Sequence, residues 1–126
     1  MRIARLSTAL YVDDVAAGRD FLVGHFGFRP ALDSEWVVKL VHDGTPCELI
    51  LLPRAAHPDQ ARAEGVIIAL EVADAAAEEA RLRAAGVDIT LPLLDEDWGE
   101  RLFQVRDPNG VTVQLVQWLA PAPVTA

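Results

Sequence analysis

Cysteine and long apolar runs are both scarce in this chain of 126 residues, and each shortage excludes a class of protein. With Cys47 as its single cysteine, the chain has no internal disulfide, which is typical of proteins from a reducing cytoplasm. No apolar run reaches the roughly 18 residues of a membrane-spanning helix, so we expect no membrane partner. The first residues lead directly into a strand-like pattern without the features of a signal peptide. These observations favour a cytoplasmic protein.

Basic residues are also scarce, since 11 Lys and Arg stand against 19 Asp and Glu and give a net charge of −8. The deficit is uneven: residues 1–63 hold seven basic and eight acidic side chains, whereas residues 64–126 hold four and eleven. Without a basic stripe to neutralise phosphates, nucleic acid is excluded as a partner. The acidic surface favours a cationic small ligand, although ordinary solubility explains the same charge.

The chain repeats itself weakly but in register. Gly44 lies four residues before Glu48, and Gly110 lies four residues before Gln114, so both pairs are separated by the same 66 positions. Self-similarity at this scale indicates two copies of one supersecondary unit. We therefore expect an α+β fold of two β-α-β-β-β repeats that form a cup-shaped mixed sheet with the helices outside. The side chains that line the cup then decide the function.

Each repeat contains one expected helix. The first is capped by Asp13 and Asp14 and runs to about Phe26, where Gly27 stops it. The second is capped by Asp74 and runs through residue 85. Alternating apolar residues predict the strands, at residues 6–12, 28–33, 36–42, 46–52, 66–72, 87–91, 100–106 and 111–118, with a loop at residues 92–99.

The pattern also predicts how the chain is divided. Residues between the two repeats are polar, contain proline and lack a strand period, and the residues after Leu119 are rich in alanine and proline. We expect a first βαβββ module at residues 1–53, a linker at 54–64, a second βαβββ module at 65–119 and a flexible tail at 120–126.

Three features together are similar to a known superfamily: the doubled units, a Val-x-Asp segment before each helix, and the turn at residues 106–111 (Arg-Asp-Pro-Asn-Gly-Val) before a final apolar strand. From about Arg5 to Trp118 the chain resembles the vicinal oxygen chelate superfamily. That superfamily includes glyoxalase I, extradiol dioxygenases, fosfomycin-resistance enzymes and bleomycin-resistance proteins. The resemblance implies a ligand cavity inside the cup and, in the enzymes, a divalent metal held by one inward residue from each of four strands.

The resemblance places Ser7, Glu48, Ile67 and Gln114 at the four metal-ligand positions. Ile67 cannot bind a metal and Ser7 is a poor neutral ligand. The remaining two oxygen ligands do not hold Zn²⁺, Ni²⁺ or Mn²⁺ tightly. The three histidines supply no replacement, because none has a partner at ligand spacing. We therefore expect no metal cofactor, and the chain is most similar to the metal-free, drug-binding branch.

Strand alternation predicts which side chains face the cavity, and they include Ser7, Tyr11, Glu48, Gln114 and Trp118. This mixture of apolar walls and a few polar groups suits a small, partly aromatic ligand. Glu48 is the most informative of these side chains, because a carboxylate among apolar residues needs a cation or a hydrogen-bond donor. The alternative use of Glu48 is an internal ion pair with an arginine such as Arg101, or solvent exposure at the mouth of the cup.

Two further tryptophans are candidate ligand contacts. Trp98 lies with four acidic residues and Arg101 in residues 95–101 (Asp-Glu-Asp-Trp-Gly-Glu-Arg), and this loop resembles the ligand-contacting loop of the drug-binding branch. An indole ringed by carboxylates attracts a flat or cationic molecule, although Trp98 could instead anchor its own turn. Trp36 is expected to begin a strand, where it forms an opposite wall or serves in packing.

The sequence thus predicts a small-molecule-binding protein of the glyoxalase/bleomycin-resistance type, which sequesters an aromatic or cationic antibiotic without a metal. The resemblance further implies a homodimer. One alternative is a lyase, isomerase or dioxygenase of the same superfamily, either metal-dependent or using Glu48 as a general base. Another is an accessory subunit whose cup is filled by its own side chains.

Overall fold

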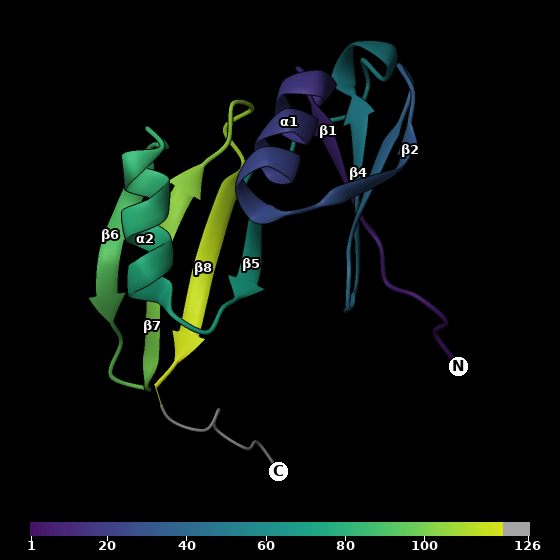
Figure 1. The fold of residues 1–126 in the computed structure, drawn as a ribbon. Coiled ribbons are helices and arrows are strands. Elements are labelled where there is room, and N and C mark those ends of the chain that lie inside the picture. The colour runs from purple at the N-terminus through teal and green to yellow at the C-terminus, as the bar shows by residue number, and fades with distance from the viewer. Residues whose placement is uncertain (120–126) are drawn as a thin grey trace. The chain divides into compact units, whose positions relative to one another are not determined.

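The computed structural model describes residues 1–119, and the predicted tail at 120–126 lies outside the described residues. The chain divides into two compact units, a first unit of Met1–Gly65 and a second unit that begins at Val66 (Figure 1). The first unit contains β1 (Thr8–Val12), α1 (Val15–Phe26), β2 (Arg29–Asp33), β3 (Val38–His42), β4 (Thr45–Pro53) and a short 3₁₀ helix, η1 (Arg54–Ala56). The second contains β5 (Ile67–Glu71), α2 (Ala75–Ala84), β6 (Ile89–Asp95), β7 (Glu100–Arg106) and β8 (Thr112–Trp118).

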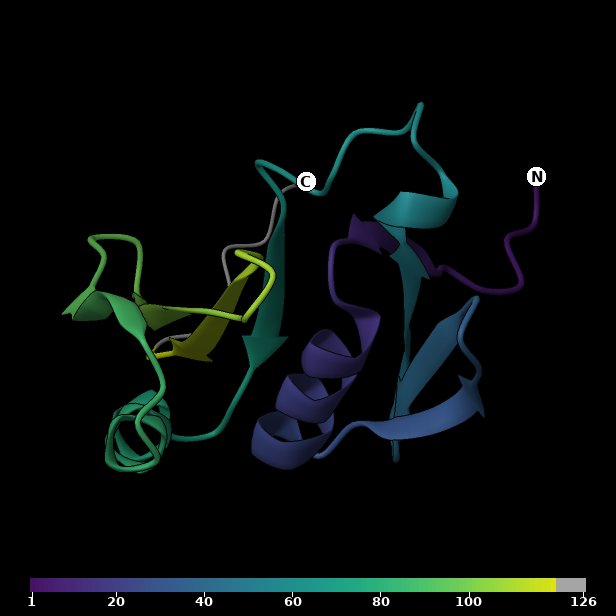
Figure 2. The same cartoon turned by 90° about the horizontal axis from the view of Figure 1, so that it is seen from above.

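The strands of each unit form a four-stranded mixed sheet with the same topology. The strand order is β1-β4-β3-β2 in the first unit and β5-β8-β7-β6 in the second. The first strand of each unit pairs in parallel with the last, and the remaining pairs are antiparallel. Each helix lies along one face of the sheet of its own unit (Figure 2). The predicted α+β class and the two βαβββ repeats are confirmed.

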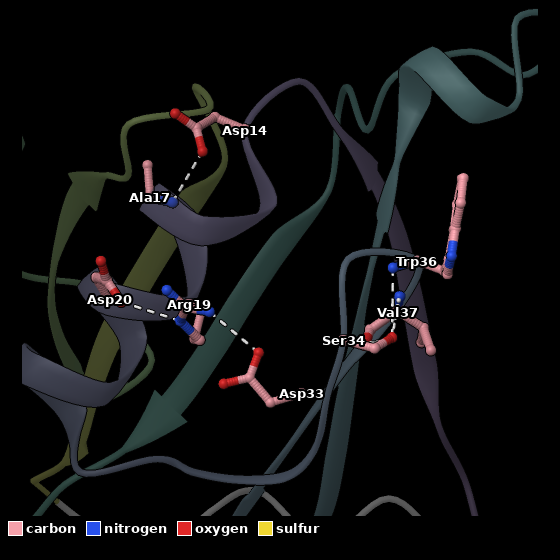
Figure 3. Close-up of polar contacts among 8 residues, drawn as sticks. All are labelled: Asp14, Ala17, Arg19, Asp20, Asp33, Ser34, Trp36 and Val37. Atoms are coloured by element: carbon pink, nitrogen blue, oxygen red, sulfur yellow. Dashed lines mark hydrogen bonds and ion pairs between the residues drawn. The ribbon is translucent and has the colours of Figure 1, made fainter.

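Both helices begin at the predicted aspartate caps. The side chain of Asp14 accepts a hydrogen bond of 3.0 Å from the backbone N–H of Ala17 (Figure 3), and Asp74 accepts one of 3.0 Å from Ala77. These bonds satisfy N–H groups that have no partner inside a helix. Gly27 ends α1 with a φ of +74°, a conformation that favours glycine. Neither helix of the described chain is long and apolar enough to cross a membrane.

The core of each unit lies between the helix and one face of the sheet. In the first unit it includes Leu22, Val38, Leu40 and Leu51, and in the second Leu82, Phe103, Val105, Val113 and Leu115. Because side chains alternate along a strand, the residues between these core positions point to the other sheet face. We call this second face, turned away from the helix, the open face of the unit. The candidate polar residues Glu48 and Gln114 lie on this open face.

The strand predicted at residues 87–91 is longer than expected. β6 continues through Pro92 to Asp95, where the sequence predicted a loop. Proline is tolerated here because β6 is an edge strand and the pairing with β7 is irregular around this point. The next N–H, that of Leu93, donates to the carboxylate of Glu79 at 2.6 Å instead of to a strand. The connection to β7 is therefore a short turn.

The sequence predicted that Trp36 begins a strand, and this prediction is wrong, because β3 starts at Val38. The hydroxyl of Ser34 accepts hydrogen bonds from the N–H groups of Trp36 and Val37, at 3.3 and 3.1 Å, and holds these residues in a turn (Figure 3). The Trp36 side chain is 65% exposed. The hydrogen bonds from the backbone to the Ser34 hydroxyl thus stabilise a turn where the apolar pattern predicted a strand.

Residues 54–64, predicted as a linker, fall within the first unit. Two arginines of this segment approach the same carboxylate: Arg54 lies 3.8 Å and Arg62 3.6 Å from Asp13, at the start of α1. These are exposed ion pairs, which contribute little individually. They nevertheless show that the segment follows the surface of the first unit.

Candidate functional site

Glu48, on the open face of β4, is a buried carboxylate with several partners in its own unit. Only 8% of the residue is exposed. The hydroxyl of Ser7 donates to Oε1 at 2.6 Å, the Nη1 of Arg5 lies 3.4 Å from Oε2, and the Nζ of Lys39 lies 3.9 Å from Oε1. Burial of a carboxylate is tolerated when it is paired in this way. Ser7 and Glu48, both predicted site residues, are thus brought together.

The strand register explains this cluster. Thr8 of β1 pairs with Leu49 of β4, so one residue earlier Ser7 lies beside Glu48. On β3, Lys39 lies between the buried Val38 and Leu40 and therefore points to the open face. Sequence reasoning missed Arg5 and Lys39 and suggested Arg101 as an alternative partner. The parity of the first and third strands was the signal that could have found them.

A pocket of about 600 Å³ lies beside Glu48, and all the residues that line it belong to the first unit. Its charged side chains are Arg5, Arg29, Lys39 and Glu48. Its small and apolar wall includes Ala31, Leu32, Val41, Thr45, Pro46 and Cys47. The lining thus carries three positive groups and one negative group. This local charge is opposite in sign to the charge of the whole chain.

The corresponding place in the second unit holds neutral groups. Gln114 of β8 accepts a hydrogen bond of 2.8 Å at its side-chain oxygen from the amide of Gln104 on β7. The strand pairing places Ala69 opposite Gln114, whereas Ile67, to which the resemblance assigned a ligand position, pairs with Thr112. Neither Ala69 nor Ile67 carries an atom that binds a metal. At the ligand position on β8 the second unit therefore presents an amide oxygen that is already hydrogen bonded.

A divalent metal does not fit this set of side chains. The hydroxyl of Ser7 is committed to Glu48, whose oxygens also face Arg5 and Lys39, so a cation at this carboxylate would meet two positive groups. Zinc, nickel and manganese sites use several imidazole, thiolate or carboxylate ligands. Within residues 1–119 no group of three or more His, Cys, Asp or Glu side chains is placed to hold a metal.

Trp98 lies in the short turn between β6 and β7. The N–H of Glu96 donates to the carbonyl of Glu100 at 2.8 Å, and the N–H of Gly99 donates to the carbonyl of Glu96 at 3.0 Å. The Trp98 side chain is 56% exposed. The turn is thus closed by its backbone, and much of the indole is left in contact with solvent.

Trp118 lies at the end of β8 near this turn. It pairs with Glu100 and shares the open face with Gln114, and the next residue, Leu119, donates its N–H to the carbonyl of Gly99 at 2.8 Å. Two of the predicted ligand contacts, Trp98 and Trp118, therefore belong to the same end of the second unit's sheet.

Arg101 is separated from the open face. It pairs with Gln117, whose side chain accepts a hydrogen bond from Ala75 at the start of α2, so Arg101 points to the helix side of the sheet. There its guanidinium binds Asp95 through bonds of 2.7 and 3.0 Å. The hydrogen bond from Arg101 holds the pKa of Asp95 below its usual range. Arg101 is thus the partner of Asp95.

Tyr11 is half-buried and its ring packs on the imidazole of His57, with ring centroids 5.0 Å apart. The N–H of Ala63 also donates to the backbone carbonyl of Tyr11, at 3.1 Å. Tyr11 thus packs against the segment after β4. Like Trp36, it does not line the pocket beside Glu48.

Solved structures with the same fold cover nearly the whole chain. A glyoxalase/bleomycin resistance protein/dioxygenase superfamily member from Sphaerobacter thermophilus is 27% identical with a TM-score of 0.78, covering 93% of this chain and 98% of its own. TnmS3 from a Streptomyces species, described as an antibiotic binding protein, is 24% identical with a TM-score of 0.78, covering 94% and 98%. TioX from a Micromonospora species is 27% identical with a TM-score of 0.69, covering 93% and 100%.

A search of curated proteins found no match. The family model of the Glyoxalase/Bleomycin resistance protein/Dioxygenase superfamily, in contrast, matches residues 3–115, which cover most of both units and include the Glu48 cluster. The match extends over most of the chain and agrees with the repeated βαβββ topology. The chain therefore belongs to the glyoxalase/bleomycin resistance protein/dioxygenase superfamily.

Proposed function

We propose that this protein binds and sequesters a small, partly aromatic molecule, such as an antibiotic, without using a metal. The observation that carries the proposal is the pocket of about 600 Å³ beside a carboxylate that the protein's own side chains already satisfy. A pocket of this size is in the range that small organic ligands occupy. Stoichiometric capture requires a shaped site and no reacting group.

The chemistry of the side chains supports this proposal. The residues at the family's metal-ligand positions do not suit a divalent metal, because two of the four lack a competent ligand atom. The exposed indoles of Trp36 and Trp98 offer surfaces for stacking on a flat molecule. The fold also has a precedent for such binding, since TnmS3 is described as an antibiotic binding protein.

The charge of the ligand is a separate question. The acid-rich turn around Trp98 supports the predicted cationic ligand, whereas the pocket beside Glu48 has a mainly positive lining. The proposed function therefore specifies an aromatic ligand and does not specify the charge of that ligand.

A homodimer and a cytoplasmic location also belong to the proposal, the first from the resemblance and the second from the single cysteine. Light scattering of the purified protein tests the dimer.

Fluorescence titration tests the proposed function. The metal-stripped protein is titrated with flat antibiotics of the mitomycin and bleomycin type while tryptophan emission is followed. We expect saturable quenching at one ligand per subunit. The Trp36→Ala and Trp98→Ala variants are each expected to reduce this quenching, and the variant with the larger loss identifies the indole that contacts the ligand. A flat response, with binding that appears only after a divalent metal is added, would contradict the proposal.

One observation favours a second candidate function. Glu48 borders the pocket, so its carboxylate is placed to remove a proton from a bound substrate, as in a lyase or isomerase that uses Glu48 as a general base. The hydrogen bond from Ser7 and the two nearby cations oppose this role, because they already occupy the oxygens that would have to accept the proton. Turnover of a substrate that the Glu48→Gln variant binds but does not convert would favour the enzyme.

A further inference from the structure

We propose that the pocket of the first unit recognises a carboxylate on an aromatic ligand, so that the bound molecule is an aryl acid. This inference rests on the proposed function and names the ligand class of the same pocket. It is opposite in sign to the cationic ligand that the acidic composition favours. The argument depends on which charges converge on the pocket and on which of their hydrogen-bond donors are already used.

Three positive side chains reach the pocket from three different segments. Arg5 precedes β1, Arg29 lies on β2 and Lys39 lies on β3. Residues 1–63 hold seven basic and eight acidic side chains, so three basic groups and one acidic group around one pocket are a local excess of positive charge. Local charge, more than net charge, determines which ligand a partly enclosed site attracts.

Glu48 does not use up these donors. Its short bond is the 2.6 Å bond from the neutral hydroxyl of Ser7. Arg5 at 3.4 Å and Lys39 at 3.9 Å are farther from it than the usual 2.7–2.9 Å of a charged hydrogen bond. Within the described residues the 3.9 Å approach is the one polar contact of the Lys39 ammonium, which has three N–H donors. A second carboxylate would therefore find free donors here.

Arg29 is also available to the pocket. Its guanidinium lies 3.3 Å from one oxygen of Asp43, in the turn between β3 and β4, where the Asp43 side chain is 83% exposed. An exposed pair of this kind contributes little, because water screens both charges. A carboxylate bound inside the pocket can thus attract Arg29 at little cost to the first unit.

The rest of the lining suits the aromatic part of such a ligand. Ala31, Leu32, Val41 and Pro46 provide small and apolar surface next to the charged groups. Leu32 on the edge strand β2 remains 47% exposed, which is large for a leucine in a folded sheet. A ring placed on this wall covers Leu32 and brings an attached carboxylate toward Lys39 and Arg5.

Two probes of equal size test the inference: 2-naphthoate, which carries a carboxylate, and 2-naphthamide, its neutral counterpart. Dissociation constants are measured by NMR titration of the full-length protein at low and at moderate salt. We expect 2-naphthoate to bind about tenfold more tightly than 2-naphthamide at low salt, the size of one charge-assisted hydrogen bond. We expect this advantage to shrink as salt is added.

Charge-removing variants locate the effect. Lys39→Gln and Arg5→Gln are each expected to weaken binding of 2-naphthoate about tenfold while leaving that of 2-naphthamide within twofold, which also shows that the pocket remains folded. Arg62→Gln is the matched control, because it removes the same charge from the same unit and Arg62 does not line the pocket. It is expected to leave both dissociation constants unchanged.

The failures of the two proposals are distinguishable. Equal affinity for the two probes would overturn the carboxylate preference and leave sequestration in this pocket intact. An advantage of 2-naphthoate that survives both Lys39→Gln and Arg5→Gln would also overturn the inference, because the charge would then be recognised elsewhere. Binding of neither probe in the millimolar range would overturn both the carboxylate preference and the proposed pocket.

Discussion

The two units share a topology and differ in the chemistry of their open faces. Glu48 and Gln114 occupy the same place in the repeat, 66 positions apart on the last strand of each unit. Glu48 is surrounded by a hydroxyl and two cations, whereas Gln114 takes one neutral hydrogen bond from Gln104. The repeat thus determines the strand position of the polar side chain in each unit, whereas the residues around that position determine its hydrogen bonds and ion pairs.

This difference has a physical consequence for each unit. A buried carboxylate requires compensating donors from other segments, so the Glu48 cluster depends on the placement of Ser7, Arg5 and Lys39. A neutral amide pair has no such requirement, and either partner can bond to water when the other is removed. The comparison predicts that the two cores behave alike while the two open faces do not.

The largest expected effect concerns the cores. Leu40 in the first unit and Phe103 in the second are both fully buried. Leu40→Ala and Phe103→Ala are expected to lower the free energy of unfolding by about 3 and about 4 kcal/mol, from lost burial and from the cavity left behind. Urea denaturation measures both values. A loss below about 1 kcal/mol in either variant would show that the corresponding core is not packed as described.

A smaller and unequal effect is expected on the open faces. Glu48→Ala removes the acceptor shared by Ser7, Arg5 and Lys39, and we expect a loss of about 2 kcal/mol. Gln114→Ala removes one neutral bond at a half-exposed position, and we expect a loss of at most about 1 kcal/mol. Urea denaturation of both variants gives the difference. Equal losses would contradict the contrast between the charged and the neutral face.

The smallest effect concerns the turns before the last strands. Asp107 is buried and accepts hydrogen bonds of 2.8 Å from the N–H groups of Asn109 and Val111, whereas Asp43 in the first unit is exposed. Burial raises the pKa of Asp107, and the backbone hydrogen bonds only partly oppose this. Protonation of Asp107 therefore favours the folded state. This contribution is complete below the unfolded pKa of about 3.9 and is lost as the pH rises through the higher folded pKa.

Asp107→Asn is accordingly expected to flatten the dependence of stability on pH in the window just above the unfolded pKa, because an amide does not ionise and its oxygen still accepts both bonds. Asp43→Asn is the matched control, because it makes the same substitution at an exposed position in the corresponding turn of the first unit. Thermal melts at a series of acidic pH values provide the measurement. An identical slope in the wild type and in Asp107→Asn would show that Asp107 does not titrate differently on folding.

The sequence predicted the parts of the fold that depend on neighbouring residues. The caps at Asp14 and Asp74 and the glycine that ends α1 follow from short-range patterns, and the doubled unit follows from the repeat over 66 positions. Arg5 was missed as a partner of Glu48 because it is 43 residues away in the chain. Such contacts require the pairing of β1 with β4, which no local pattern specifies.

Two local errors have equally specific causes. Proline signalled the end of a strand at Pro92, but an edge position needs no N–H donor, so β6 continued. The apolar pattern predicted that Trp36 lies in a strand, but the N–H groups of Trp36 and Val37 donate to the Ser34 hydroxyl and form a turn. In both places a hydrogen-bonding detail that the apolar pattern does not record decided the outcome.

The proline in β6 has a consequence for how copies of this protein meet in concentrated solution. An edge strand with a regular row of free N–H groups is a template on which another chain can add a strand and start an aggregate. In β6, Pro92 has no N–H to offer and the N–H of Leu93 is already bound to Glu79. Two successive positions along the β6 edge therefore offer no free N–H group to an added strand, which disfavours growth of the second unit's sheet at this edge.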